Sequence, residues 1–394
     1  MALLDLWKNA PDQVRDKQIH QLIAFAGNGK LRDGSACSDE LRAFLSMVPS
    51  SALAAYAGQC LSDAFTDSGL ALQDVVNEAG SRLGADVSPG RYRGKSSEIG
   101  FDGLWSFPNG HSIVVEVKTT DAYRIDLNVV AGYRRALIDI GRIKEGSSSI
   151  LLIVGRQDTG DLEAQIRGSR FAWDVRIISV DALNRLIAIK EEVEDPVIID
   201  RIHSILIPRE FTRLDEIADI LFSATEDIKQ ESPEDAEDEP EEDSKSKGPK
   251  FTPVAFHDAC MARFEKYLGE TFVKRTRASY YSPDKKIFVT CAVSKEHNSG
   301  AHPNYWFAFH PHQQAYLEGG NESFIVFGCG TSKRVMAIPF LEFQSLLDGL
   351  WMTEKEDRSY WHVVIDRQGE HFSLRRRKGL MPVDLTQFLL PDVG

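Results

Sequence analysis

The sequence is poor in three things: paired cysteines, long apolar runs and positive charge. Its five cysteines are scattered along 394 residues, and none of them forms a CxxC pair. This spacing predicts free thiols in a reducing compartment and fits neither a disulfide framework nor a structural zinc site. No apolar run reaches the roughly 18 residues that a membrane-spanning helix needs, so we expect no membrane association. The N-terminal stretch MALLDLWKNAPDQ lacks the basic and apolar blocks of a secretion signal, which favours a cytoplasmic protein.

The formal net charge of −13 argues against a uniformly basic nucleic-acid binder. The negative charge is unevenly distributed, however. Residues 226–250 hold eleven acidic and four basic residues, a net charge of −7, which leaves −6 for the rest of the chain. The overall charge therefore does not exclude basic surfaces elsewhere.

The acidic stretch is also poor in large apolar residues and rich in Ser and Pro. Because it cannot bury enough apolar surface to offset the entropy of ordering, we predict a disordered linker over 224–250. A solvated spacer and a nucleic-acid mimic that shields a basic groove are its two interpretations. The linker separates an N-terminal part from a C-terminal domain at 251–394. The hydrophobic content of 42% suffices for a core on each side.

The N-terminal part begins with a predicted helical region, 1–66, in which Ser38 has the character of a helix cap. From 67 to 223 helical and strand patterns alternate. The segment 69–84 has apolar residues at helical spacing, and SSILLIVG is typical of a buried strand. This alternation predicts an α/β domain.

The C-terminal domain has a different pattern. Strand-like runs such as SFIVFGCG and YWHVVID are separated by Gly, Pro and Asn turns, and helical patterns occur at 256–272 and 339–351. We therefore predict a separate α+β domain built on an antiparallel sheet.

The stretch GFDGLWSFPNGHSIVVEVKTT, residues 100–120, carries charges that a plain buried strand does not need. Side chains alternate along a strand, so Glu116 and Lys118 share one face. The turn centres on Asn109, with Gly110 suited to a left-handed conformation. In a regular hairpin around this turn Asp102 lies opposite Glu116, and directly opposed residues share a face about 5 Å apart. The sequence therefore predicts two carboxylates and an ammonium group converging on one spot.

Two neighbouring carboxylates repel each other, and each buried charge loses its hydration. A divalent cation removes this conflict, and hard oxygen ligands suit Mg²⁺, with Mn²⁺ as a substitute. Such a cation lowers the pKa of a bound water and neutralises charge on a phosphate. Lys118 can orient or deprotonate that water, or stabilise the transition state. The alternative is an ordinary strand with a surface ion pair.

The order Asp102, a gap, then Glu116-x-Lys118 resembles the motif of the PD-(D/E)xK phosphodiesterases. The order of elements over roughly 68–190 is also similar to that family: a helix, a hairpin with the motif, a helix and a strand. Phe101 stands where the family often has proline. The resemblance implies an α/β restriction-endonuclease-like core with a helical N-terminal extension. It also implies catalytic roles for all three motif residues, the two carboxylates being metal ligands.

The same resemblance implies further site residues. The family often places an acid on its first helix, where Glu78 is either a third metal ligand or a solvated flank of the helix. Mrr-like branches carry a glutamine on a later helix, and Gln165 in EAQIRGSR is the candidate catalytic residue there. Glu98, just before the hairpin, is a rival acidic ligand.

The N-terminal part, with QLIAFAGNGKLRDGS, also resembles bacterial restriction-endonuclease-like proteins associated with phage defence. Together these resemblances imply a metal-dependent DNA endonuclease of the prokaryotic cytoplasm, acting in antiphage defence or restriction. Cutting both strands needs two sites, so we expect a homodimer, with other defence proteins as candidate partners. Two hypotheses stand beside it: a non-catalytic DNA-binding or assembly subunit with a nuclease-like fold, and an RNase or single-strand nuclease.

Cationic and hydroxyl side chains around the motif are candidates for contact with nucleic-acid phosphates, the alternative being solvated helix faces. They are Arg91, Arg93, Thr119, Tyr123, Arg124, Arg167 and Arg170, with Thr120, Arg134 and Arg135 nearby.

In the C-terminal domain basic runs alternate with aromatic residues, and this mix suits the stacking of nucleic-acid bases. The stacking candidates are Tyr280, Tyr281, Trp306 and Trp361. Substrate recognition, assembly or regulation, and a second enzymatic activity are the three interpretations of this domain. Its histidines, interpreted as surface residues or as a metal group, are His297, His302, His310 and His312.

Overall fold

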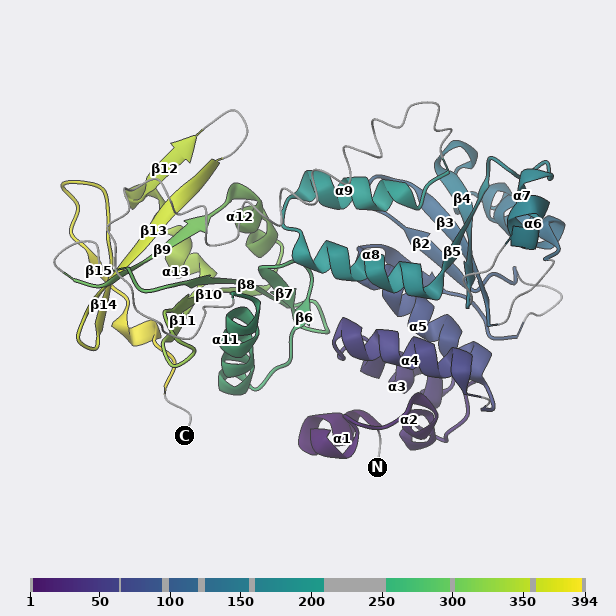
Figure 1. Ribbon diagram of the computed structural model, residues 1–394, viewed down its shortest axis with the longest axis horizontal. Helices are drawn as coiled ribbons and strands as arrows, with labels where there is room; N and C mark the ends of the chain where they lie inside the picture. The colour runs from purple at the N-terminus through teal and green to yellow at the C-terminus, as the bar shows by residue number, and fades with distance from the viewer. Residues whose placement is uncertain are drawn as a thin grey trace. The chain divides into compact units, whose positions relative to one another are not determined.

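The computed structural model describes residues 3–63, 65–93, 99–119, 125–155, 160–208, 253–297, 302–354 and 359–391. The chain divides into two compact units (Figure 1). The first comprises Met1–Glu192 and Val197–Ser223, and the second Val193–Pro196 and Ala224–Gly394. The predicted linker, 224–250, lies outside the described residues. Within the described part, the predicted division needs one change, because Val193–Pro196 belongs to the second unit.

The first unit begins with helices, as predicted. They are α1 (Leu3–Asn9), α2 (Ile19–Phe25), α3 (Ala36–Leu45), α4 (Ser50–Ser62) and α5 (Ser68–Leu83). Ser35, and not Ser38, caps α3, since its hydroxyl oxygen accepts a hydrogen bond from the amide of Ser38 at 3.3 Å. Ser38 lies one turn further on, where its buried hydroxyl donates to the carbonyl of Arg32.

A five-stranded mixed sheet follows, in the order β1-β2-β3-β4-β5. The strands are β1 (Asp86–Pro89), β2 (Gly103–Ser106), β3 (Ser112–Lys118), β4 (Ser148–Val154) and β5 (Val175–Ser179). The first three strands are antiparallel and the last three are parallel. As its apolar sequence predicts, β4 is buried along its whole length. The other helices of the unit are α6 (Leu127–Asp139), α7 (Gly160–Arg167), α8 (Val180–Glu192) and α9 (Pro196–Ile205).

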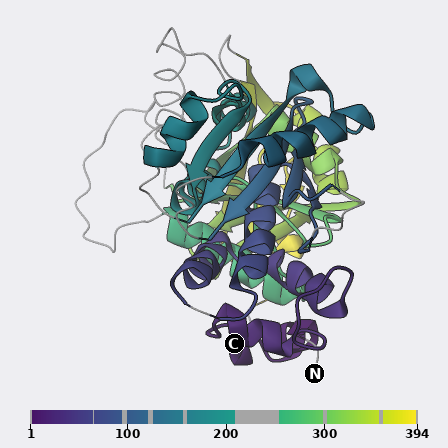
Figure 2. The same cartoon turned by 90° about the vertical axis from the view of Figure 1, so that its right-hand side faces the viewer.

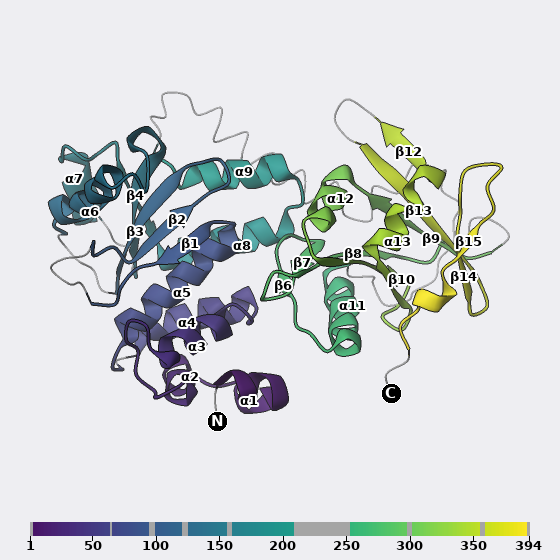
Figure 3. The same cartoon turned by 180° about the vertical axis from the view of Figure 1, so that it is seen from behind.

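The two faces of this sheet have separate hydrophobic cores. On one face Ile113 and Val115 of β3 pack with the apolar residues of α5. Figure 3 shows α5 lying against β1, β2 and β3. On the other face Val114 of β3 packs with Leu127 and Val130 of α6, and Figure 2 shows the sheet with helices on its two sides. A side chain on β3 therefore points either towards α5 or towards α6.

The described residues of the second unit form two sheets, whereas the sequence predicts one antiparallel sheet. The first has the order β11-β10-β8-β7-β6, and in it β8 and β10 are parallel. The second has the order β12-β13-β14-β15, with β9 paired to β13. The first sheet consists of β6 (Val273–Lys274), β7 (Ser279–Tyr281), β8 (Ile287–Ser294), β10 (Glu322–Cys329) and β11 (Val335–Pro339). The second consists of β9 (Asn304–Phe309), β12 (Trp351–Glu354), β13 (Ser359–Gln368), β14 (His371–Leu374) and β15 (Val383–Asp384).

One apolar core of this unit lies between the two sheets, where Phe307 of β9 and Phe327 of β10 have ring centroids 4.7 Å apart. The helices α11 (Pro253–Leu268), α12 (Pro311–Glu318) and α13 (Phe340–Gln344) contact the first of the two sheets. The protein as a whole belongs to the mixed α/β class. The five cysteines are all buried and free, as predicted. Among the described helices, none is both long and apolar enough to cross a bilayer.

Candidate active site

The hairpin that carries the charged motif has the register that the sequence predicts. Gly103 pairs with Val115 and Leu104 with Val114, and the ladder ends there. The amide of Asp102 donates to the carbonyl of Val115 at 3.1 Å and its carboxylate accepts from the amide of Val117, so Asp102 lies against the part of β3 that carries Glu116. Gly110 adopts a left-handed conformation with φ of 83°, and its amide donates to the carbonyl of Phe107. A regular, tight turn therefore fixes which residues face one another across the two strands.

Alternation along β3 determines the face on which the charges lie. Ile113 and Val115 point to the α5 side, whereas Val114 points to the α6 side. Glu116 and Lys118 continue the even-numbered series and share the α6 side. The predicted convergence of Asp102, Glu116 and Lys118 is thus present in the fold.

Asp102 is held in place through its backbone. Its carbonyl oxygen accepts three hydrogen bonds of 2.9 Å, from the side-chain amides of Gln73 and Asn77 and from the backbone amide of Gly90. The indole of Trp105 in turn donates to Asn77 at 3.1 Å. Both α5 amides are almost fully buried. The sequence does carry a signal for this pair, because two amides at i and i+4 interrupt an otherwise apolar helix face.

The two carboxylates differ in the hydrogen bonds that their oxygens accept. Oδ2 of Asp102 accepts a hydrogen bond from the backbone amide of Val117 at 2.7 Å. Oε1 of Glu116 accepts one from Nζ of Lys118 at 2.5 Å, an ion pair in which the glutamate side chain is only 11% exposed. Oε2 of Glu116 is buried and has no hydrogen-bond partner among the described residues. The site therefore presents one buried carboxylate oxygen without a donor in the described part of the chain.

The charges of the site act on one another. Burial and the nearby charge of Glu116 raise the pKa of Asp102 to about 7, against smaller opposing effects of the Val117 amide and Lys118. Burial alone would lower the pKa of Lys118, but its hydrogen bond to Glu116 and the charges of both carboxylates raise it. The lysine is therefore charged at neutral pH, while the carboxylate pair carries unrelieved repulsion.

Tyr133 on α6 is a site residue that no sequence motif reveals. Burial raises the pKa of Tyr133, and the charges of Glu116 and Asp102 raise it further. Its hydroxyl also lies close to the chain that leads into the motif, since a Cβ atom built on Gly100 would be 3.1 Å from it. Tyr133 follows Lys118 by fifteen residues, and no spacing rule identifies it from the sequence.

No family model matches this chain, and no curated protein matches it. Within the described ranges no group of three or more His, Cys, Asp or Glu side chains is placed to hold a metal ion. The candidate ligand set is the pair Asp102 and Glu116.

Glu78 does not join this pair, contrary to the prediction of a third metal ligand. Its carboxylate forms an ion pair of 2.6 Å with Arg82 one turn along α5. That buried guanidinium also donates to the carbonyls of Leu45 and Val48. The physical reason is the layering of the sheet: α5 covers the face of β3 that carries Val115, whereas Glu116 points to the opposite face.

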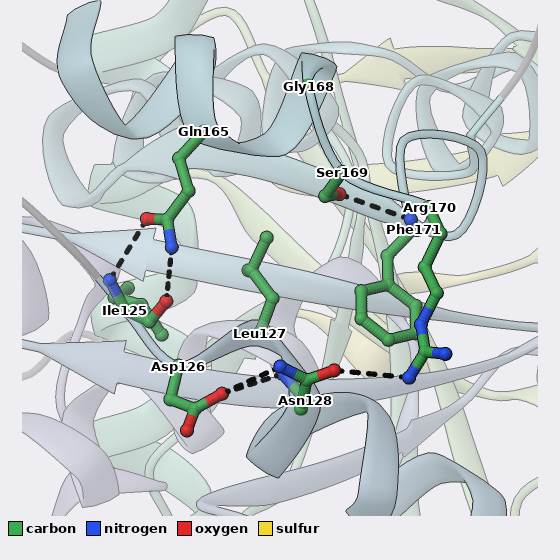
Figure 4. A pocket seen from close by; sticks show the side chains of 9 residues that line it. All are labelled: Ile125, Asp126, Leu127, Asn128, Gln165, Gly168, Ser169, Arg170 and Phe171. Atoms are coloured by element: carbon green, nitrogen blue, oxygen red, sulfur yellow. Dashed lines mark hydrogen bonds between the residues drawn. The ribbon is translucent and has the colours of Figure 1, made fainter.

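Gln165 is likewise placed differently from the prediction (Figure 4). Its side-chain amide clamps the backbone of Ile125, donating to the carbonyl at 2.6 Å and accepting from the amide at 3.1 Å. Both ends of the side chain are thus used to hold the segment that leads into α6. We assign Gln165 a structural role and not the predicted catalytic one.

The predicted phosphate-binding residues are only partly described. Arg170 is exposed, donates to Asn128 at 3.1 Å and lies over the ring of Phe171 (Figure 4). Arg93 and Arg167 are exposed, Arg91 is half-buried, and Thr119 lies next to Gly69 at the end of β3. By contrast, Arg134 and Arg135 form ion pairs within the unit. Glu98, Thr120, Tyr123 and Arg124 lie outside the described residues.

The aromatic candidates of the second unit separate by burial. Tyr280 is buried, so its ring is not available for stacking, and the half-buried Trp361 packs on the core between the sheets. Tyr281 and Trp306 are half-buried. His310 and His312 stack on each other at 5.2 Å, and His312 lies 3.5 Å from the buried Glu194. The described histidines of this unit form no metal group.

Proposed function

We propose that this protein is a metal-dependent phosphodiesterase that cuts DNA. The observation that carries the proposal is the carboxylate pair of half-buried Asp102 and buried Glu116, with Lys118 beside it and one oxygen of Glu116 left without a donor among the described residues. A plain structural ion pair would need a single carboxylate. The second carboxylate adds repulsion that raises the pKa of Asp102, and a cation bound between the two would remove it.

The residues fit a hard divalent cation. Carboxylate oxygens are the ligands that Mg²⁺ prefers, and Mg²⁺ binds through one or two carboxylates while keeping several waters. Oε2 of Glu116 is buried and has no donor within the described ranges, which costs free energy that coordination of a cation would offset. When bound, Mg²⁺ or Mn²⁺ would lower the pKa of a bound water and offset the charge on the scissile phosphate.

The side chains of the site have different roles in the proposed reaction. Asp102 and Glu116 would hold the cation, and the three hydrogen bonds to the carbonyl of Asp102 keep that residue in position. Lys118 keeps a positive charge beside the phosphate and orients the attacking water. The hydroxyl of Tyr133 lies on the same side and can donate a hydrogen bond to a phosphate oxygen.

The order of elements supports a restriction-endonuclease-like core in the first unit. A helix precedes a mixed sheet, the motif lies on its central hairpin, and a helix leads to the next parallel strand. With that fold we propose a role in prokaryotic antiphage defence or restriction in the cytoplasm. Cleavage of both strands would be carried out by a homodimer with one site per chain.

The test is a substrate panel with Mg²⁺: unmodified and methylated duplex DNA, single-stranded DNA and RNA. We expect wild-type protein to cut duplex DNA, and Glu116→Ala and Lys118→Ala to reduce the rate by at least about 100-fold. Asp139→Asn, which changes an exposed carboxylate on α6, is the matched control and should cut like wild type. Equal cleavage by wild type and Glu116→Ala would contradict the proposal.

The same panel separates the alternatives. Duplex binding without cleavage under any metal would favour a non-catalytic DNA-binding or assembly subunit. Cleavage confined to RNA or to single-stranded DNA would support the proposed phosphodiester hydrolysis but show that duplex DNA is not the substrate.

A further inference from the structure

The second sheet of the second unit has one face in the core and one face outside it. Phe307, Val363 and Ile365 belong to the inner face, which packs against the other sheet. Because side chains alternate along a strand, the residues between them point outward. The pairing of β13 with β12 and β9 shows which residues share this outer face, since directly opposed residues lie on the same side.

The outer face is aromatic. Trp351 of β12 is opposite His362 of β13, and the residue opposite Tyr360 is Thr353. Trp306 of β9 is opposite Val364 on the same outer series of β13. We call Trp306, Trp351, Tyr360 and His362 the aromatic face. Trp351 is 40% exposed, which is unusual for so large an apolar side chain.

Hydrogen bonds and ring contacts fix three of these rings in orientation, those of Trp306, Tyr360 and His362. The indole of Trp306 donates to Nδ1 of His362 at 3.2 Å, so the neutral imidazole carries its proton on Nε2 and donates to Thr353 at 2.7 Å. Burial lowers the pKa of His362, which keeps it neutral. The ring of Tyr360 lies 5.0 Å from that of His362 and 6.1 Å from that of Trp306. These three rings are therefore ordered before any ligand binds.

A run of four cations, residues 375–378 (RRRK), borders the aromatic face. The backbone amide of Arg377 donates to the carbonyl of Gly349 at 2.8 Å, and its guanidinium donates to the carbonyl of Asp348. This places the run beside the start of β12, close to Trp351. Of its four cations only Arg375 has an acidic partner among the described residues, namely Asp366. The basic run 375–378 therefore carries net positive charge next to the aromatic face.

We propose that the aromatic face and the basic run 375–378 together bind single-stranded DNA. Bases would stack on Trp351 and its neighbours while the cations neutralise backbone phosphates, which is the combination that single-strand binding surfaces use. An intact duplex hides the faces of its bases, and an apolar peptide would leave the cations without partners. The choice of DNA rests on the proposed function, but the surface lies in a different unit from the carboxylate pair.

The test is binding of a labelled oligothymidylate of about 20 nucleotides to the full chain, measured by fluorescence anisotropy in EDTA so that no cleavage occurs. Trp351→Ala should raise the Kd about tenfold, whereas Trp351→Phe should keep most of the affinity because a ring remains. The double variant Arg377→Ala, Lys378→Ala should make the slope of log Kd against log salt shallower by about 0.7 for each phosphate that is no longer neutralised.

Tyr267→Ala is the matched control, because Tyr267 is an exposed aromatic residue of the same unit that lies on α11. It should bind like wild type. The proposal is overturned if wild type does not bind the oligonucleotide, if Trp351→Ala binds it as tightly as Tyr267→Ala, or if Trp351→Ala weakens the binding of a duplex as much as that of the single strand. Since binding is measured without metal, a protein that binds but never cleaves DNA would contradict the nuclease proposal alone.

Discussion

Lys118 donates to one oxygen of Glu116 at 2.5 Å, while the other oxygen of the same carboxylate is buried without a partner among the described residues. The lysine therefore provides a hydrogen bond to only one of the two carboxylate oxygens of Glu116. The same glutamate, together with burial, raises the pKa of Asp102 across the hairpin. This asymmetry distinguishes the site from an ordinary surface ion pair.

Asn77 is predicted to position Asp102. It links the Trp105 indole to the Asp102 carbonyl, so Asn77→Ala removes two hydrogen bonds: the buried indole loses its acceptor, and the carbonyl keeps only Gln73 and Gly90 as donors. We expect a decrease of about 1–3 kcal/mol in the free energy of unfolding and slower cleavage with little change in KM. Urea denaturation and steady-state kinetics measure the two effects. Reduced stability with kcat unchanged would assign Asn77 a purely structural role.

The raised pKa of Asp102 predicts how metal-free stability changes with pH. The folded state binds a proton more tightly than the unfolded state, in which the value is 3.8, so stability is lost as pH rises through about 7. In Asp102→Asn the side chain does not titrate, and its amide oxygen can still accept the hydrogen bond from the Val117 amide. In EDTA the Tm of Asp102→Asn relative to wild type should therefore increase between about pH 5 and about pH 8. A constant difference would contradict this coupling.

Two helical glycines give a matched pair for stability. A Cβ atom on Gly80 of α5 would lie 2.4 Å from the ring of Trp105, whereas one on Gly58 of α4 would meet nothing within 4 Å. Gly58→Ala should stabilise the protein by up to about 1 kcal/mol through helix propensity. Gly80→Ala should destabilise it by about 1–3 kcal/mol through overpacking against the sheet. Thermal unfolding checks both, and a stabilising Gly80→Ala would contradict the close approach of α5 to the sheet.

Tyr133→Phe tests the hydroxyl that lies near the carboxylates. The ring packs on the α6 core and would be retained, so stability should be unchanged. If the hydroxyl binds the substrate phosphate, cleavage should fall by about tenfold, the effect of removing one hydrogen bond to a charged group. A variant that cuts like wild type would remove Tyr133 from the site.

The local parts of the site could be predicted from the sequence. Alternation and the turn at Gly110 determine the register of one hairpin, and this is enough to bring Asp102, Glu116 and Lys118 together. Glu78 could not be predicted correctly, because periodicity identifies one face of a helix but not which face of a sheet that helix covers.

Other features depend on residues far apart in the sequence. Gln165 binds the backbone of Ile125, forty residues earlier. In the second unit, short strands such as β12 and β15 carry too little pattern to identify. The sequence indicates its strands in general but not their division between two sheets, because pairing partners are not encoded locally.

Direct measurement of metal binding tests the central claim, that Asp102 and Glu116 hold a divalent cation. Isothermal titration with Mg²⁺ and Mn²⁺ needs no substrate and no activity. Wild type and Lys118→Ala should bind one ion per site, since the lysine is not a ligand. Glu116→Gln and Asp102→Asn should weaken binding by more than about tenfold, because even changes to residues that only support the ligands have effects of that size. Binding by Glu116→Gln that equals that of wild type would contradict the account.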